Sequence, residues 1–349
     1  MILFKRAADL SGWLQSQRSQ GKTIGFIPTM GALHAGHISL IDISKKSAGV
    51  TVCSIFVNPT QFNDPKDFQK YPITIEKDIY LLEKAGTDVL FLPEVDELYP
   101  GGTTALEKYE LGRLETLFEG KYRPGHFQGV CQVMRRLLDI VEPDDLYMGQ
   151  KDYQQCMVVR KLLELRKYAT RLHPCPIVRE TDGLAMSSRN MRLTESERAK
   201  APAIFRALSL VQEAWESGEV RHKEVLEPVI SQAKAILEQA GFRIDYVEVA
   251  DAVTLEPIDS GEDGIAAFGS RDGGTQGESK GGTQGAGGGE AQGERRGGSQ
   301  GAGRDGATGE SRGGAPEETG SEAGNGRKAV ALVAAFLGEV RLIDNMLLS

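Results

Sequence analysis

The chain has 349 residues, of which 40% are hydrophobic and 26% are charged, and its formal net charge is −8. This length is enough for one large or two ordinary domains, and the composition excludes a fibrous or wholly disordered protein. The mild negative charge argues against bulk electrostatic binding of nucleic acid, and no apolar stretch is long enough to suggest a membrane span or a signal peptide, so we expect a cytoplasmic protein without nucleic-acid or membrane partners.

Strand-like and helix-like segments alternate through the first half of the chain. Short apolar and β-branched runs predict strands at 23–29, 50–57, 88–93 and 145–149. Apolar residues at helical spacing predict helices at 38–46, 74–85, 129–141 and 152–167. The alternation predicts an α/β fold with a Rossmann-like parallel sheet and helices on both faces. Such sheets bind ligands at the carboxyl ends of their strands.

In the second half of the chain the predicted strands and helices no longer alternate. Helices are expected at about 195–217 and 222–240, and strands at 243–251 and 329–338. We therefore place a domain boundary near residue 177. The prediction is a nucleotide- and substrate-binding domain at 1–177 and a smaller C-terminal α+β domain at 178–349.

A glycine-rich insert lies within this second domain. Residues 260–327 hold 24 of the chain's 42 glycines and contain no Phe, Tyr or Trp after Phe268. A segment of this composition buries too little apolar surface to offset the entropy of ordering it, so we expect a disordered surface loop.

Two of the five histidines, His34 and His37, lie three residues apart directly after the first predicted strand. The amino end of a helix offers free N–H groups and a positive dipole end, which suit a phosphate group. Imidazoles at this position can add hydrogen bonds, and Gly36 between them leaves room for a nucleotide. The same pair could instead form half of a metal site or have a structural role.

Two more strands end in polar residues. The second strand is followed by Asn58 and Gln61 in a proline-containing turn, where amide groups suit hydroxyl and carboxylate recognition. The fourth strand ends at a helix start with Lys151, Asp152 and Gln155. The lysine suits a phosphate, and the aspartate suits a ribose hydroxyl or Mg²⁺. Each segment alone could equally be an ordinary turn or a solvated helix start.

A glycine-containing loop at 182–190 carries Ser187, Ser188 and Arg189. Two hydroxyls and one guanidinium can clamp a phosphate, although a plain surface loop has the same composition. Arg123, in a Pro-Gly turn, suggests a loop near the site or at a subunit contact. Tyr71 could pack on a ligand or belong to the core.

Together these segments resemble the pantothenate synthetase (pantoate–β-alanine ligase) family in order and spacing. The motifs are PTMGALHAGH, FVNPTQF, EGKYRPGHFQGV, GQKDYQQ, DGLAMSSRN and RLIDN. The resemblance covers about 1–258 and 329–349, and the insert stands where family members have a short connector. It implies a two-domain enzyme of the HxGH nucleotidyltransferase-like group that is usually a homodimer.

The resemblance also implies an activity. Pantoate and β-alanine would be condensed to pantothenate (vitamin B5), a precursor of coenzyme A, while ATP is converted to AMP and pyrophosphate. The family is understood to use Mg²⁺ and to pass through an enzyme-bound pantoyl adenylate. It assigns no definite metal ligands to this chain.

The resemblance also implies roles for individual residues. The residues that would act on the developing charge are His34, His37, Lys151, Ser187, Ser188 and Arg189. Contacts to ATP would come from Met30, Gly36, His37, Gly149, Lys151, Asp152, Val178, Met186, Ser187, Ser188 and Arg189. Contacts to pantoate or β-alanine would come from Asn58, Gln61, Tyr71 and Gln155.

Two alternatives remain open from the sequence. Another HxGH enzyme, a cytidylyltransferase or an aminoacyl-tRNA synthetase, would share the histidine pair but leave FVNPTQF and GQKDYQQ unexplained. An RNA-binding role for the insert is suggested by RGG-like fragments. It is opposed by the insert's negative net charge and by its lack of aromatic residues for base stacking.

Overall fold

A computed structural model describes residues 1–104, 106–218, 223–258 and 328–349 of the chain. All of these residues belong to one compact unit. The predicted disordered insert, 260–327, lies outside the described residues. Within the described ranges, no helix is long and apolar enough to cross a membrane.

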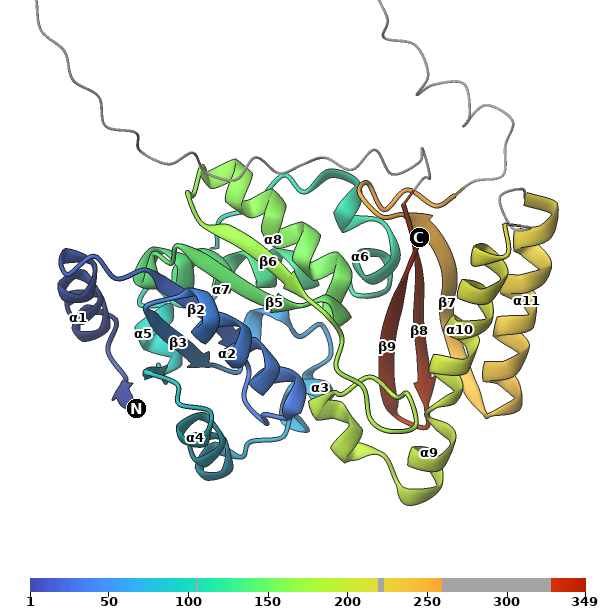
Figure 1. Cartoon of the computed structure of the whole chain (residues 1–349), viewed down its shortest axis with the longest axis horizontal. Helices are drawn as coiled ribbons and strands as arrows, with labels where there is room; N and C mark the ends of the chain where they lie inside the picture. Colours follow the sequence, from blue (N-terminus) through green and yellow to red (C-terminus); the bar gives the residue numbers. More distant parts are fainter. Residues whose placement is uncertain (105, 219–222, 259–327) are drawn as a thin grey trace, which may run out of the picture. The chain divides into compact units, whose positions relative to one another are not determined.

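The first part of the fold is a six-stranded parallel sheet with the strand order β1-β4-β3-β2-β5-β6. Figure 1 labels its strands β3, β2, β5 and β6. The strands are β1 (Ile2–Phe4), β2 (Ile24–Thr29), β3 (Val50–Ile55), β4 (Val89–Phe91), β5 (Asp145–Gly149) and β6 (Arg171–Cys175). All of β3 and nearly all of β2 are buried, as expected for central strands covered on both faces. The predicted Rossmann-like sheet is therefore confirmed.

Helices and short 3₁₀ turns connect these strands. The helices are α1 (Ala7–Ser19), α2 (Ala35–Ser47), α3 (Pro65–Gln69), α4 (Ile75–Lys84), α5 (Val95–Leu98), α6 (Phe118–Tyr122), α7 (His126–Val141) and α8 (Tyr153–Arg166). The 3₁₀ turns are η1 (Pro59–Gln61), η2 (Gly112–Glu115), η3 (Gln150–Asp152) and, further along, η4 (Ser188–Arg192).

The two faces of the parallel sheet form separate hydrophobic cores. Successive residues of a strand point to opposite faces, so Phe26 packs in the core with α1, α7 and α8 while Ile27 packs in the core with α2 and α4. The same alternation places Val52 on the first face and Cys53 on the second. Helices thus cover both faces, as the sequence pattern predicts.

The C-terminal part is an antiparallel sheet with helices on one face, which confirms the smaller α+β component. Its strands are β7 (Phe242–Asp251), β8 (Ala329–Leu337) and β9 (Val340–Leu348), and its helices are α9 (Glu195–Lys200), α10 (Ala203–Glu216) and α11 (Lys223–Gln239). Val247 and its face pack on α10 and α11, whereas Tyr246 and its face pack toward α6 and α8. A domain boundary at residue 177 stays a prediction.

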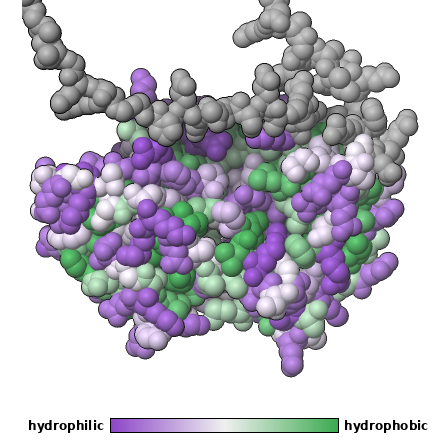
Figure 2. All heavy atoms as spheres, viewed as in Figure 1, coloured by the Kyte–Doolittle hydropathy of each residue, from purple (hydrophilic) through white to green (hydrophobic). Residues whose placement is uncertain are grey.

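One local prediction needs correction, and some edge strands were not predicted. The helix expected at 195–217 is interrupted, because Pro202 lacks the N–H that a continuous helix needs, and α10 begins directly after it. The strands β1, β6 and β9 were not expected. All three are edge strands, β1 and β6 are short, and β6 contains Pro174. On the face shown in Figure 2, hydrophilic side chains predominate and hydrophobic ones form only small, separate patches.

Candidate active site

The candidate site lies where the strand order reverses. The chain runs from β2 outward through β3 to β4, and then β5 pairs with the opposite edge of β2. In open parallel sheets such a reversal leaves a crevice at the carboxyl ends of the two strands. Here the segment after Thr29 and the segment after Gly149 border this crevice.

A cavity of about 190 Å³ occupies the crevice. Every site residue predicted from the sequence lines it. These are Met30, His34, Gly36, His37, Asn58, Gln61, Tyr71, Gly149, Lys151, Asp152, Gln155, Val178, Met186, Ser187, Ser188 and Arg189. Four stretches that are far apart in sequence thus meet at one pocket.

The two histidines are held by backbone N–H groups at the start of α2. Nδ1 of His34 accepts from the N–H of Gly36 at 3.2 Å, and Nδ1 of His37 accepts from the N–H of His34 at 3.4 Å. A neutral imidazole that accepts at Nδ1 carries its proton on Nε2. Both rings can therefore donate from Nε2. A Cβ atom at position 36 would lie 2.9 Å from Nδ1 of His34, so a side chain there would force the His34 ring to shift.

Both histidines are held in the neutral form. Burial, helped by the charge of Lys151, lowers the pKa of His34 to about 4. Burial, helped by His34 and then by Lys151, lowers the pKa of His37 well below its usual value. The pair thus supplies hydrogen-bond donors without positive charge, and the charge that a phosphate needs must come from other side chains.

We expect the His34 imidazole of the ligand-free protein to titrate near pH 4 and to stay neutral from about pH 8 to about pH 5. The unfolded chain takes up this proton near pH 6.5, so folding stability should fall as the pH drops from about 6.5 toward 4. NMR of the imidazole Cε1–H group measures the titration, and the His34→Gln variant assigns the resonance. A titration midpoint near pH 6.5 would show that burial does not lower the pKa of His34 in the folded protein.

Lys151 supplies one positive charge. Its ammonium lies 3.5 Å from the Asp152 carboxylate, and its side chain is 16% exposed. The side-chain amide of Asn345, in the RLIDN segment of β9, donates to the backbone carbonyls of Gln150 and Lys151, both at 2.9 Å. The C-terminal sheet thus fixes the turn that presents the lysine.

The segment 185–189 supplies a second positive charge to the pocket, the guanidinium of Arg189. The N–H of Met186 donates to the carbonyl of Val178 at 3.0 Å, which joins this segment to the chain leaving β6. Arg189 forms a 2.8 Å ion pair with Asp67 on α3. Burial would raise the pKa of Asp67, but its bonds to Arg189 and Arg192 outweigh burial and lower it.

The amide side chains of Asn58 and Gln61, which follow β3, both line the cavity, and Asn58 holds Gln61 in place. The Asn58 amide donates to Oε1 of Gln61 and to the carbonyl of Gly129, and its oxygen accepts from the hydroxyl of Tyr99. Asn58 is 1% exposed, so its side chain is engaged in shaping the pocket. Gln61 is turned by these bonds toward Met30, whose sulfur lies 3.3 Å from Nε2 of Gln61.

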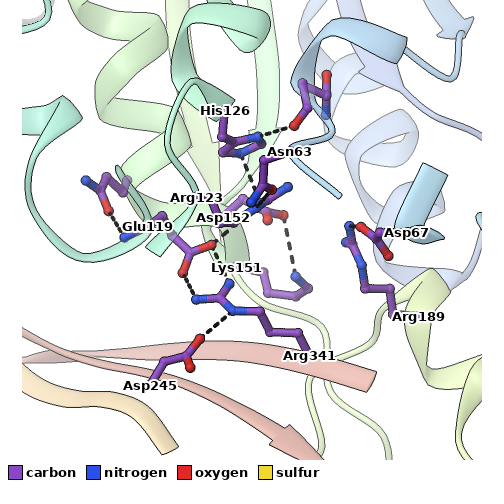
Figure 3. A network of polar contacts seen from close by, with 12 residues as sticks. Asn63, Asp67, Glu119, Arg123, His126, Lys151, Asp152, Arg189, Asp245 and Arg341 are labelled. Carbon is purple, nitrogen blue, oxygen red and sulfur yellow. Dashed lines mark hydrogen bonds and ion pairs between the residues drawn. The ribbon is translucent and has the colours of Figure 1, made fainter. Parts of the chain in front are cut away.

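A larger cavity of about 540 Å³ adjoins the first and shares Lys151, Asp152, Ser187 and Arg189 with it. It extends toward the C-terminal sheet, where Arg341 reaches across to Glu119 (Figure 3). Arg123 lines this second cavity, in agreement with the expectation of a loop near the site.

Sequence reasoning missed the apolar wall of the pocket. Four residues of α7 line it: Val130, Val133, Met134 and Leu137. Their helical spacing is visible in the sequence, but the same spacing is typical of a core-facing helix, so it does not separate pocket wall from core. His173 lies outside the pocket, where it bonds to Asp145 at 2.7 Å and stacks on Tyr147.

Comparison with known proteins identifies the family. The sequence profile of the pantoate-beta-alanine ligases matches residues 2–274. The chain belongs to this family. A pantothenate synthetase of Bacteroides thetaiotaomicron is 43% identical over 75% of the chain and 90% of its own length. One of Aquifex aeolicus is 41% identical over 75% of the chain and 92% of its own length.

Solved structures agree with this family membership. Pantothenate synthetase of Thermus thermophilus is 32% identical, with a TM-score of 0.74 over 99% of both chains. A pantoate-beta-alanine ligase of Francisella tularensis, complexed with β,γ-ATP and β-alanine, is 29% identical, with a TM-score of 0.66 over 99% of this chain and 97% of the other. These matches favour a ligase of this family over the other HxGH enzymes considered above.

Proposed function

We propose that this chain condenses pantoate with β-alanine in an ATP-dependent reaction that passes through pantoyl adenylate. The condensation is the activity of the family to which the chain belongs. The observation that carries the proposal for the site is the meeting of two neutral imidazole donors with Lys151 and Arg189 at one pocket.

The first half-reaction gives the carboxylate a leaving group. A pantoate carboxylate oxygen attacks the α-phosphorus of ATP, the bond from that phosphorus to the bridging oxygen breaks, and pyrophosphate departs with the electron pair. His34 and His37 donate from Nε2 to phosphate oxygens, and Lys151 and Arg189 balance the charge. Donors fixed in place before the reaction stabilise the charge that develops during it.

The second half-reaction forms the amide bond. The free amine of β-alanine attacks the acyl carbon of pantoyl adenylate, the bond from that carbon to the AMP oxygen breaks, AMP departs with the electron pair, and the amine releases a proton to water. Gln61, Gln155 and Tyr71 hold pantoate during both steps, while Asn58 fixes Gln61. In this scheme the protein acts by positioning and electrostatics.

The pocket also suits the Mg²⁺ that accompanies ATP. Mg²⁺ is usually held by one or two carboxylates together with substrate phosphates. Asp152 lines both cavities beside Lys151, and its carboxylate is the donor we assign to the ion. When bound, the ion would neutralise phosphate charge.

Exchange of labelled pyrophosphate into ATP tests this function. With pantoate present and β-alanine absent, the full-length protein should catalyse exchange, because the first half-reaction is reversible. Amino acids in place of pantoate serve as the control and should support none. Folded protein without pantoate-dependent exchange would overturn the assignment.

We also propose that the protein is a homodimer, as the family resemblance implies. Analytical ultracentrifugation of the full chain tests it, and a monomer at micromolar concentration would contradict it.

A further inference from the structure

The turn that carries the histidine pair has an unusual backbone. Gly31 has a φ of +80° and Ala32 has a φ of 49°, so two successive residues adopt the left-handed conformation. This conformation is ordinary for glycine and strained for alanine. Consecutive N–H groups in such a turn point toward one concave side, where they can bind an anion.

The anion in this concavity is the side chain of Asp78, from α4. Its Oδ2 accepts from the N–H of Ala32 at 2.9 Å, and its Oδ1 accepts from the N–H of Leu33 at 2.8 Å. The hydroxyl of Thr74 donates to Oδ1 at 3.0 Å. Asp78 is 0% exposed, so these bonds are formed out of water.

The hydrogen-bond geometry explains why residue 78 is an aspartate. Two backbone donors face two different oxygens, and among side chains of this size only a carboxylate offers two acceptor oxygens. Within the described ranges no lysine or arginine forms an ion pair with Asp78. Its charge is therefore balanced by hydrogen-bond donors, which fixes its position relative to the turn.

The remaining polar groups of the turn are held from other sides. The hydroxyl of Thr29 accepts from the N–H of Gly31 at 3.2 Å, and the hydroxyl of Ser188 donates to the carbonyl of Ala32 at 3.1 Å. His34, whose ring faces the pocket, comes two residues after Ala32. A shift of the turn would therefore move this ring and, through it, His37.

We propose that Asp78 is a positioning residue of the active site, whose carboxylate holds the 31–33 turn and thereby sets the places of His34 and His37. The proposal rests on the function proposed above, because it assigns Asp78 an effect on the step in which those histidines act. Asp78 lines neither cavity of the site and acts only through the turn.

The Asp78→Asn variant tests the proposal. It keeps the size of the side chain but replaces one acceptor oxygen with an NH₂ group, which opposes a backbone N–H. We expect kcat of pantoate-dependent exchange to fall roughly 10- to 100-fold, because small misplacements of catalytic groups have effects of this size, while KM for ATP changes by less than about threefold.

The matched control is Asp144→Asn. Asp144 also accepts a backbone N–H, that of Ile24 at 2.7 Å, but at the amino end of β2, away from the pocket. Its kcat should stay within about twofold of the parent. An equal loss of kcat in Asp78→Asn and Asp144→Asn, or an unchanged kcat in Asp78→Asn, would overturn the proposal.

Two further readouts separate positioning from folding. The NMR resonances of the His34 and His37 rings should shift in Asp78→Asn and not in Asp144→Asn, whatever the activity; unshifted rings would overturn the proposal. If Asp78→Asn folds poorly, adding Ala32→Gly relieves the strained φ and should restore stability without restoring kcat. Recovery of both would mean that Asp78 is only structural. Absence of exchange in the parent protein would instead overturn the proposed function.

Discussion

Replacing Lys151 with methionine should lower kcat of pantoate-dependent pyrophosphate exchange by about 10³-fold, equivalent to about 4 kcal/mol of transition-state stabilisation. The two imidazoles of the pocket are neutral, so in the proposed mechanism Lys151 is one of two cations that offset the charge on the phosphates. Its side chain is mostly buried, and a charge acts more strongly there than in water. Methionine retains most of the aliphatic stem and removes only the ammonium.

The matched control is Lys161→Met. Lys161 lies on α8, the helix that follows the Lys151 turn, in an exposed ion pair with Glu164 at 3.4 Å. This change of the same charge should leave kcat within about twofold and stability within about 0.5 kcal/mol. If Lys151→Met lost activity only in proportion to a loss of folded protein, its ammonium would have no part in the chemistry.

The fold could be predicted largely because its strands and helices are specified locally. The run Val50–Ile55 is apolar and β-branched, which is enough to indicate a buried strand, and the alternation with helices is enough to indicate a parallel sheet. The edge strand β6 carries Arg171, His173 and Pro174, so no comparable pattern marks it. Its pairing with β5 is decided by the assembled sheet.

The site residues divide in the same way, into those that a local sequence pattern indicates and those that only tertiary contacts bring to the site. His34 and Lys151 each follow a recognisable strand, and the topology of the sheet brings the ends of those strands together. Asp78 gives only a weak signal: it lies at helical spacing between Ile75 and Leu82, on the inward face of α4, but this spacing does not show what its carboxylate contacts. Its role depends on which loop its helix meets, a tertiary contact that neither periodicity nor spacing encodes. Asn345 of β9 belongs to the RLIDN motif, but its bonds to the Lys151 turn were not predicted, for the same reason.

The second large effect concerns stability. Replacing Arg341 with methionine should lower the free energy of unfolding by about 3–5 kcal/mol, measured by urea denaturation. The guanidinium of Arg341 binds both oxygens of Glu119 at 2.7 Å and one oxygen of Asp245 at 2.8 Å (Figure 3). The pair joins β9 to α6, and both partners are largely buried. Burial would raise the pKa of Glu119, but Arg341 outweighs it and lowers the pKa to about 2.

Without Arg341 two buried carboxylates lose their main partner, and Arg123, 3.6 Å from Glu119, compensates only in part. The double variant Glu119→Gln/Arg341→Met removes one of those charges and should regain much of the lost stability, because a neutral side chain costs less to bury. Arg198→Met is the control: its ion pair with Asp182 is more exposed, so about 1 kcal/mol or less should be lost. Equal losses in Arg341→Met and Arg198→Met would show that the buried network does not hold β9 to α6.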